Sequence, residues 1–268
     1  MKVSVLIPTV NRPTALAATL MALVVQSFGD FEITIADQSR TFIRTEPTIQ
    51  TISRIFELHD RPPLHILQNL PPRGIAQQRQ FLLNHSTGTF SLFLDDDVIL
   101  EPRAISRLVQ AMEEEECGFG GMAPVGLSYR EDVRTGEQEI SWWNGRVQPE
   151  RVRPEGPGWE RYKLHSAANM LHIGEKLRAS GAGQKKYKVA WIGGCVLYDT
   201  AKLRDTGGFE FWQKLPPEHC GEDVLAQLRL MEKYGGFGLV PSGAYHQELP
   251  TTIANREVNA PEYLLAAR

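Results

Sequence analysis

The sequence predicts an α/β fold, a doubly wound and mostly parallel sheet with helices on both faces in three α/β/α layers. Two observations predict it. Short apolar runs typical of buried strands alternate with longer segments of helical periodicity through the first third of the chain. The chain also has 268 residues, 42% of them hydrophobic, which is enough to bury one sizeable core. We therefore expect one domain over 1–268, with a first half at 1–125 and a second half at 126–268.

The first half carries the clearest alternation. A β-branched run predicts a strand at 3–7, and alternating apolar and polar residues predict another at 31–37. Between them, Leu16, Leu20 and Leu23 recur at the spacing of one helical face, in a helix that starts near a proline. The same order then repeats, with a strand at 64–67, a helix at 74–86, a strand at 90–94, a helix at 102–116 and a strand at 119–125.

The second half begins with a segment of different amino-acid composition. From 128 to 187 the sequence is rich in Gly, Pro, Arg and Trp and has no clear period, which predicts a loop-rich insertion or a lid over the sheet. Its tryptophans either anchor a long loop in the core or form an aromatic platform for a ring-shaped substrate. Regular structure is expected to return as an apolar strand over 187–199 that is interrupted by Gly193 and Gly194, a helix over 222–235 and a last strand over 237–241.

Composition excludes several classes of protein. The net charge is -3 and there is no long basic run, so a nucleic-acid partner is not expected. The longest apolar stretch, at 15–25, is shorter than the roughly 20 residues that cross a bilayer, so no transmembrane segment is expected. The 3 cysteines are widely spaced, which favours reduced thiols and a cytoplasmic protein.

Three carboxylates, Asp95, Asp96 and Asp97, directly follow the strand expected at 90–94. Ligands of open α/β sheets bind beyond the carboxyl ends of the strands, where the two earlier strands also end. Adjacent carboxylates repel one another unless a cation joins them, and Mg²⁺ or Mn²⁺ binds such oxygens together with substrate phosphates. In an extended chain, Asp95 and Asp97 would face the same side. The alternatives are thus a divalent metal site with a phosphate-bearing ligand, or solvated turn residues.

Six stretches of the sequence form a specific combination through their order and spacing: VSVLIPTVNRP, ITIADQS, RGIAQQRQFLLNHSTGTFSLFLDDDV, WIGGCVLYDTAKLRDTGGF, GEDVLAQLRL and YHQE. Together they resemble family 2 of the inverting nucleotide-sugar glycosyltransferases, which have the GT-A fold. The resemblance implies an enzyme that moves a sugar from a nucleoside-diphosphate donor, with UDP expected, to an acceptor hydroxyl. It also implies that 1–125 binds the nucleotide sugar and that 126–268 binds the acceptor.

The resemblance assigns catalysis to Glu222 and Asp223, an acidic pair that opens a helix. Asp223 would be the general base that takes the proton of the acceptor hydroxyl. By themselves, without the upstream motifs, two acids at a helix start are better explained by the positive end of the helix dipole. The acceptor would be a glycan, a lipid-linked molecule or a small molecule. The protein would reach a lipid-linked acceptor by peripheral contact with the inner membrane face. Its expected contacts are Trp191, Gly193, Gly194 and Trp212.

The resemblance also implies the donor contacts. Asp97 and His246 would bind Mn²⁺ or Mg²⁺, and Asp37 would accept a hydrogen bond from the base imide. The full set of expected nucleotide-sugar contacts is Pro8, Thr9, Asn11, Asp37, Arg79, Asp95 and Asp96. Two stretches depart from the family pattern, because ADQS lacks the second acid and the glycine, and QRQ keeps only the arginine.

Two other functions stay open on the sequence. A sugar-phosphate nucleotidyltransferase could share this kind of sheet, but it would need a Gly-rich phosphate loop after the first strand, and PTVNRPTA contains no glycine. A non-catalytic nucleotide- or glycan-binding module is the other alternative. The presence of both Asp97 and Asp223 favours an enzyme over such a module.

Overall fold

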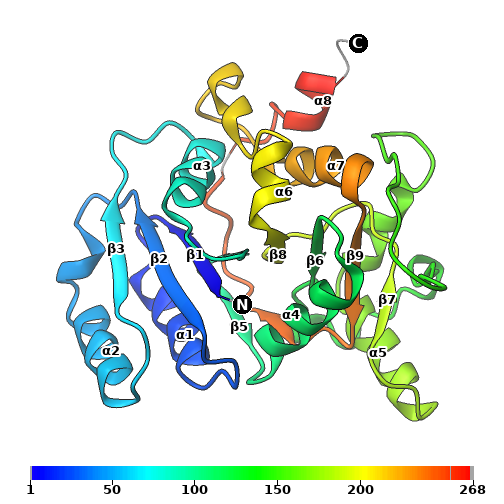
Figure 1. Cartoon of the computed structure of the whole chain (residues 1–268), viewed down its shortest axis with the longest axis horizontal. Helices are drawn as coiled ribbons and strands as arrows, with labels where there is room; N and C mark the ends of the chain where they lie inside the picture. The colour runs from blue at the N-terminus through cyan, green and yellow to red at the C-terminus, as the bar shows by residue number, and fades with distance from the viewer. Residues whose placement is uncertain (1, 254, 266–268) are drawn as a thin grey trace.

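The computed structural model describes residues 2–253 and 255–265, and its centre is a mixed sheet of eight strands (Figure 1). The strand order is β3-β2-β1-β4-β8-β6-β9-β7. Strands β1 to β4 are parallel to one another and β6 is parallel to β9, whereas β8 runs antiparallel between β4 and β6, and β7 runs antiparallel to β9. The bounds are β1 Val3–Thr9, β2 Phe31–Asp37, β3 Leu64–Gln68, β4 Phe90–Leu94, β6 Phe119–Gly121, β7 Lys185–Tyr187, β8 Cys195–Asp199 and β9 Gly236–Val240.

Helices cover both faces of this sheet, as expected for a doubly wound α/β fold. Side chains alternate along each strand, so Val3, Val5 and Ile7 join one apolar cluster and Leu6 joins the other. The first cluster packs under α1, α2 and α4, and the second under α3, α5, α6 and α7. The bounds are α1 Pro13–Val24, α2 Pro47–Leu58, α3 Ile75–His85, α4 Ala104–Glu115, α5 Asn169–Ala179, α6 Thr200–Asp205, α7 Glu222–Tyr234 and α8 Ala260–Leu265.

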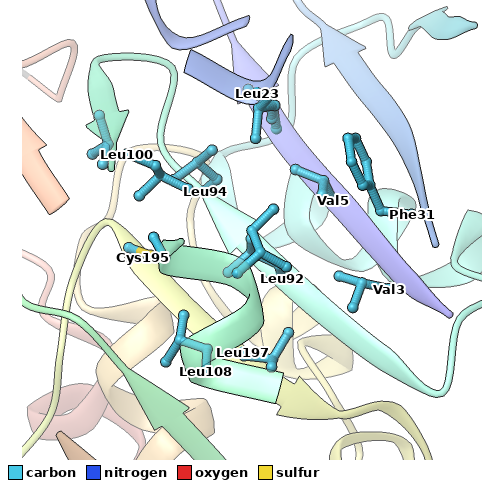
Figure 2. Close-up of a cluster of buried hydrophobic side chains, with 14 of the residues drawn as sticks. Val3, Val5, Leu23, Phe31, Leu92, Leu94, Leu100, Leu108, Cys195 and Leu197 are labelled. Carbon is cyan, nitrogen blue, oxygen red and sulfur yellow. The ribbon is translucent and has the colours of Figure 1, made fainter. Parts of the chain in front are cut away.

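The first apolar cluster shows why the early strands are continuous apolar runs (Figure 2). Leu92 of β4 lies between Val5 of β1 and Leu197 of β8, and all three are fully buried. Burying an aliphatic side chain of this size stabilises the fold by roughly 1.5–3 kcal/mol. Cys195 belongs to the same cluster, and burial raises the pKa of its thiol to about 12, so it packs as a small apolar group.

The predicted strands and helices of the first half are present, but two expectations for the second half are wrong. The break in the strand expected over 187–199 is longer than its two glycines, because β7 ends at Tyr187 and β8 begins only at Cys195. Gly194 has φ +74°, which no strand residue adopts. The segment 128–187 is not entirely loop, because it contains α5 and short 3-10 turns.

Several elements were absent from the prediction. Helix α2 carries Ile49, Ile52 and Phe56 on its buried face, at a spacing that does predict a helix. Strands β5 (Val98–Leu100) and β10 (Ala244–His246) form a small antiparallel pair beside the main sheet. Each has three residues, too few for a periodic signal. Within 2–253 and 255–265, no helix has the length and apolar character that crossing a bilayer requires.

Candidate functional site

A cleft of about 560 Å³ opens at the carboxyl ends of β1 and β4 and at the start of α7. It brings together residues that are up to 251 positions apart in the sequence, from Pro8 to Asn259. Most of the residues expected from the sequence line it. Its polar lining includes Thr9, Arg12, Gln78, Arg79, Asp95, Asp96, Asp97, Glu222, Asp223 and His246, and its apolar lining includes Pro8, Ile75 and Trp191.

The three adjacent aspartates form a tight turn between β4 and β5, not an extended strand end. The turn is closed by a hydrogen bond from the Val98 N–H to the Asp95 carbonyl at 3.3 Å. The expectation that Asp95 and Asp97 face one side is therefore wrong. Asp96 and Asp97 instead converge on one nitrogen, Nη1 of Arg12, at 3.1 and 2.9 Å, while Asp95 faces Arg79.

Arg12 is a site residue that the sequence interpretation missed. It lies between β1 and α1, and its side chain is only 16% exposed. Burial by itself lowers the pKa of its guanidinium, but the charges of Asp96 and Asp97 hold that pKa above its usual value. Arg12 therefore supplies the positive charge that two neighbouring carboxylates require, and it does so from inside the cleft.

Asp96 is the anchor of the turn. Its Oδ2 accepts a hydrogen bond from Thr9 Oγ1 at 2.6 Å, and its backbone carbonyl accepts one from Thr19 Oγ1 at 2.8 Å. Burial raises the pKa of Asp96 to about 6, against the opposing effects of Thr9 and Arg12. A carboxyl group that is buried and hydrogen-bonded in this way fixes the backbone on which Asp95 and Asp97 are presented.

Asp97 and His246 are the residues of this cleft that could hold a metal. Asp97 Oδ1 lies 3.6 Å from His246 Nε2, and the backbone N–H of Gln247 donates to the Asp97 carbonyl at 2.9 Å. No group of three or more His, Cys, Asp or Glu side chains suited to a metal occurs in the part of the chain that the structure describes. One carboxylate and one imidazole nevertheless fit a divalent ion that takes most of its ligands from a bound diphosphate.

Arg79 joins the two acidic groups of the cleft. Its Nη2 donates to Asp95 Oδ1 at 3.1 Å and its Nε donates to Glu222 Oε1 at 2.8 Å. Burial opposes its charge, but Asp95 and Glu222 raise the pKa of the guanidinium above its ordinary value. Arg79 is only 6% exposed and lies over the Phe93 ring at 5.7 Å. It is thus a buried cation that holds the aspartate turn against the start of α7.

Asp223 lies in the first turn of α7, beside Glu222. Its Oδ1 accepts a hydrogen bond from the Val224 N–H at 2.8 Å. Burial, followed by repulsion from Glu222, raises the pKa of Asp223 to about 7, although Arg79 opposes the shift. A carboxylate with a pKa near neutrality that faces a cleft is suited to general base chemistry.

Two of the expected nucleotide contacts instead build the loop after β2. Asp37 is fully buried, and its two oxygens accept hydrogen bonds from the N–H groups of Ser39 and Ile43, each at 2.8 Å. Asn11, at φ +54°, accepts one from the Arg40 N–H at 3.1 Å. Neither Asp37 nor Asn11 is among the residues that line the cleft.

Of the expected acceptor residues, two lie at the cleft and two pack elsewhere. Trp191 lines the cleft, and Gly193 lies beside Asp223, where an added Cβ would be 3.7 Å from Oδ2. Gly194 packs closely on Pro124, because an added Cβ would be 2.8 Å from its Cγ. Trp212 packs against the second apolar cluster and is not part of the cleft lining.

The tryptophans of the 128–187 segment pack as anchors. Trp142 and Trp159 lie against the second apolar cluster and Trp143 lies against the first. None of the three is among the residues that line the cleft, so the interpretation as loop anchors fits the described residues better than that of an aromatic platform.

A second chamber of about 450 Å³ adjoins the cleft, and Val10, Ile75 and Gln78 line both. Gln38, which the sequence interpretation missed, is part of its wall. Its Nε2 is buried and has no hydrogen-bond partner among the described residues. Such an unpartnered amide is costly unless a ligand satisfies it. Its position after Asp37, at the end of β2, was the available signal.

His219, on the far wall of this chamber, is structural. Its Nε2 accepts a hydrogen bond from the Ala76 N–H at 3.2 Å, in the first turn of α3, and its Nδ1 donates to the Pro216 carbonyl at 2.7 Å. Gly74 lies so close that an added Cβ would be 2.5 Å from the His219 ring. A side chain at Gly74 would therefore displace the histidine that satisfies the start of α3.

Comparisons with known proteins agree with this fold. The model of the family described as "Glycosyl transferase family 2" matches residues 4–167 of this chain. GalNAc(5)-diNAcBac-PP-undecaprenol beta-1,3-glucosyltransferase of Campylobacter jejuni is 30% identical over 113 residues, which are 42% of this chain and 35% of that protein. An uncharacterized glycosyltransferase of Haemophilus influenzae is 28% identical over 111 residues, 41% of this chain and 34% of that protein.

Two solved structures are similar in fold. S. aureus TarS in complex with UDP-GlcNAc has a TM-score of 0.57 at 17% identity, over 94% of this chain and 60% of that one. The mannosyltransferase PcManGT from Pyrobaculum calidifontis, in complex with GDP-Man and Mn²⁺, has a TM-score of 0.52 at 15% identity, over 88% and 54%. The chain spans about a third of the length of both curated relatives.

The GT-A fold and the family match define the class of this protein, a glycosyltransferase. The chain belongs to glycosyl transferase family 2.

Proposed function

We propose that this glycosyltransferase moves a sugar from a UDP-linked donor to an acceptor hydroxyl, with inversion at the anomeric carbon. The observation that carries the proposal is the arrangement of one cleft. A carboxylate of raised pKa, Asp223, lines the same cleft as the Asp95–Asp97 turn with its arginine, Arg12. One side can bind a diphosphate and the other can activate a nucleophile, which are the two requirements of a direct displacement.

The donor diphosphate would lie against the aspartate turn. Arg12 provides a guanidinium in the wall of the cleft, and Asp97 with His246 would hold Mn²⁺ or Mg²⁺. A bound divalent ion would neutralise the negative charge of the leaving diphosphate. The neighbouring folds support this donor class, since one was solved with UDP-GlcNAc and another with GDP-Man and Mn²⁺.

Asp223 would take the proton of the acceptor hydroxyl as that oxygen attacks the anomeric carbon. The bond from this carbon to the diphosphate oxygen breaks in the same step, and its electron pair leaves with the nucleoside diphosphate. Glu222 is engaged by Arg79 at 2.8 Å and acts as a neighbour that raises the proton affinity of Asp223. Trp191 and Gly193 lie next to this carboxylate and would form the acceptor side.

The function is tested by measuring release of the nucleoside diphosphate from several nucleotide sugars, with and without candidate glycan and lipid-linked acceptors. We expect release to depend on the acceptor, on Mn²⁺ or Mg²⁺, and on a UDP-linked donor. A thermal-shift series with the same nucleotides checks donor binding separately, because a ligand of the native state raises the melting temperature. A chain that binds these donors but never releases diphosphate would be a non-catalytic binding module.

Replacing Asp97 with alanine is expected to weaken the binding of metal and donor together. Loss of a hydrogen-bonding charged group costs roughly 1.5–3 kcal/mol, which is at least tenfold in affinity. The measurement is the Mn²⁺ dependence of the thermal shift produced by UDP. Asp132→Ala removes the same charge from an exposed position outside the cleft and should leave this dependence intact. Full Mn²⁺ dependence in the Asp97 variant would contradict the metal assignment.

We further expect Gln38, and not Asp37, to contact the nucleobase, because both oxygens of Asp37 are engaged by backbone N–H groups. A glutamine amide offers a donor and an acceptor, and uracil presents both. Gln38→Leu keeps the volume but removes both groups, which should weaken UDP binding by roughly two- to tenfold. Binding of inorganic pyrophosphate to the same variant should not change. If both ligands weaken equally, Gln38 is not a nucleobase contact.

A further inference from the structure

A hollow of about 450 Å³ lies outside the catalytic cleft, between the start of α4, the end of α5 and the start of β7. None of its lining residues belongs to the cleft described above. Three arginines, Arg103, Arg107 and Arg178, line it together with a single carboxylate, Glu101. In a chain whose net charge is -3, this lining is a local concentration of positive charge.

Arg107 forms the fixed part of the hollow. Its side chain is 22% exposed, its Nε donates to Gln184 Oε1 at 2.5 Å, and its Nη2 donates to the Pro241 carbonyl. Burial lowers the pKa of its guanidinium, the charge of Glu101 opposes that shift, and the charges of Arg103 and Arg178 act in the same direction as burial. Arg107 therefore lies within electrostatic range of both other arginines that line the hollow.

Little negative charge opposes these arginines. Glu101 Oε1 accepts a hydrogen bond from the Tyr245 hydroxyl at 2.7 Å, and its Oε2 lies 3.7 Å from Arg107. Arg103 and Arg178 are exposed, and within 2–253 and 255–265 their side chains have no ion pair or hydrogen bond. The position of Arg178 in the last turn of α5 suits that helix dipole but leaves its head group unpaired.

The start of α4 adds to the same field. This helix has twelve residues. Its Ala104 N–H donates to the Glu101 carbonyl and its Ile105 N–H donates to Gln26 Oε1, while Arg103, the N-cap, makes no side-chain hydrogen bond to the helix. The positive end of the helix therefore lies beside the three guanidinium groups. Together they form a concave, positively charged surface with two arginine head groups free to bind.

We propose that this hollow binds a phosphate-bearing anion. The planar donors of arginine match phosphate oxygens, and the start of α4 favours the same charge. A volume of about 450 Å³ suits a molecule larger than one phosphate group. The ligand is either a free phosphorylated small molecule or the headgroup of an anionic phospholipid. The site is independent of the proposed sugar transfer, because it shares no residue with the cleft.

The first experiment titrates inorganic pyrophosphate into the whole protein by calorimetry, in EDTA and at low salt. The double variant Arg103→Ala with Arg178→Ala removes the two unpaired guanidinium groups from exposed positions, so the fold should be retained, which circular dichroism checks. The control removes two exposed arginines outside the hollow, Arg146→Ala with Arg151→Ala, whose side chains are 67% and 72% exposed.

We expect binding of pyrophosphate, or cosedimentation with phosphatidylglycerol vesicles, to weaken at least tenfold in the Arg103 and Arg178 double variant and less than about twofold in the control. Loss of pyrophosphate binding assigns a free phosphorylated ligand. Loss of vesicle binding alone, measured against pure phosphatidylcholine, assigns a lipid headgroup. Equal behaviour of the two double variants, or no binding by the wild-type protein in either assay, would overturn the proposal.

Discussion

Replacing Asp223 with asparagine is expected to lower kcat by about 10²- to 10⁴-fold while the affinity for the donor changes little. Asparagine has almost the same shape but cannot accept the proton of the acceptor hydroxyl. Because the Asp223 side chain bonds to the Val224 N–H and the turn is held by Arg12 and Arg79, the diphosphate side of the cleft should be preserved. The measurements are the turnover rate for nucleoside-diphosphate release and the thermal shift by the donor.

The turnover rate of the wild-type enzyme should fall as the pH is lowered. Burial and the neighbouring Glu222 raise the pKa of Asp223 to about 7, and only the ionised form can act as a base. The rate should therefore be maximal above about pH 7 and fall about tenfold per pH unit below it. The residual rate of Asp223→Asn should lack this fall. An unchanged rate in Asp223→Asn, or an unchanged pH profile, would remove the base assignment. Asp205→Asn, at an exposed site, is the matched control.

Replacing Arg79 with glutamine should have the largest effect on stability, about 3–5 kcal/mol in the free energy of unfolding. The change leaves Glu222 buried without its partner and releases Asp95 from the other end of the guanidinium. Arg79 also lowers the pKa of Asp223, so its loss should move the acidic limb of the pH–rate profile toward higher pH. Denaturant unfolding and the pH profile measure the two effects separately.

A matched control separates positioning from simple loss of a buried arginine. Arg61 is half-buried and donates to the Val24 and Gln26 carbonyls at 2.8 and 2.7 Å, far from any carboxylate of the cleft. Arg61→Gln should also destabilise the fold, but the pH profile should stay where it is. Arg79→Lys should restore part of the profile, because a charge returns without the two-pronged geometry. If Arg79→Gln and Arg61→Gln gave the same pH profile, Arg79 would be a structural residue only.

Apart from α2 and β5, the order of strands and helices in the first half was predictable because it depends on local patterns. The strand at Phe31–Asp37 and the helix from Pro13 follow from hydrophobic periodicity and from proline, which act over a few residues. The break before Cys195 was predictable in position from Gly193 and Gly194 but not in length, since the apolar run at 189–192 carries no local signal that it lies outside a strand.

The sequence predicted which residues belong to the candidate site better than it predicted the hydrogen-bond partners of those residues. Asp97 and Asp223 carry motif signals that identify them from the sequence alone. Asp37 carries the same kind of signal, yet the structure places its oxygens on backbone N–H groups of its own loop. A carboxylate that follows a strand can either contact a ligand or accept hydrogen bonds from its own loop, and the sequence contains nothing that decides between these roles.

The sequence by itself determined the family, the GT-A fold class and which carboxylates meet at one edge of the sheet, because the carboxyl ends of its parallel strands share that edge. Only the tertiary structure decided which cation each carboxylate receives. Arg12 reaches Asp97 across 85 positions and Arg79 reaches Glu222 across 143. Such pairs have no local pattern, since they form only when tertiary packing brings elements far apart in the sequence within hydrogen-bonding distance.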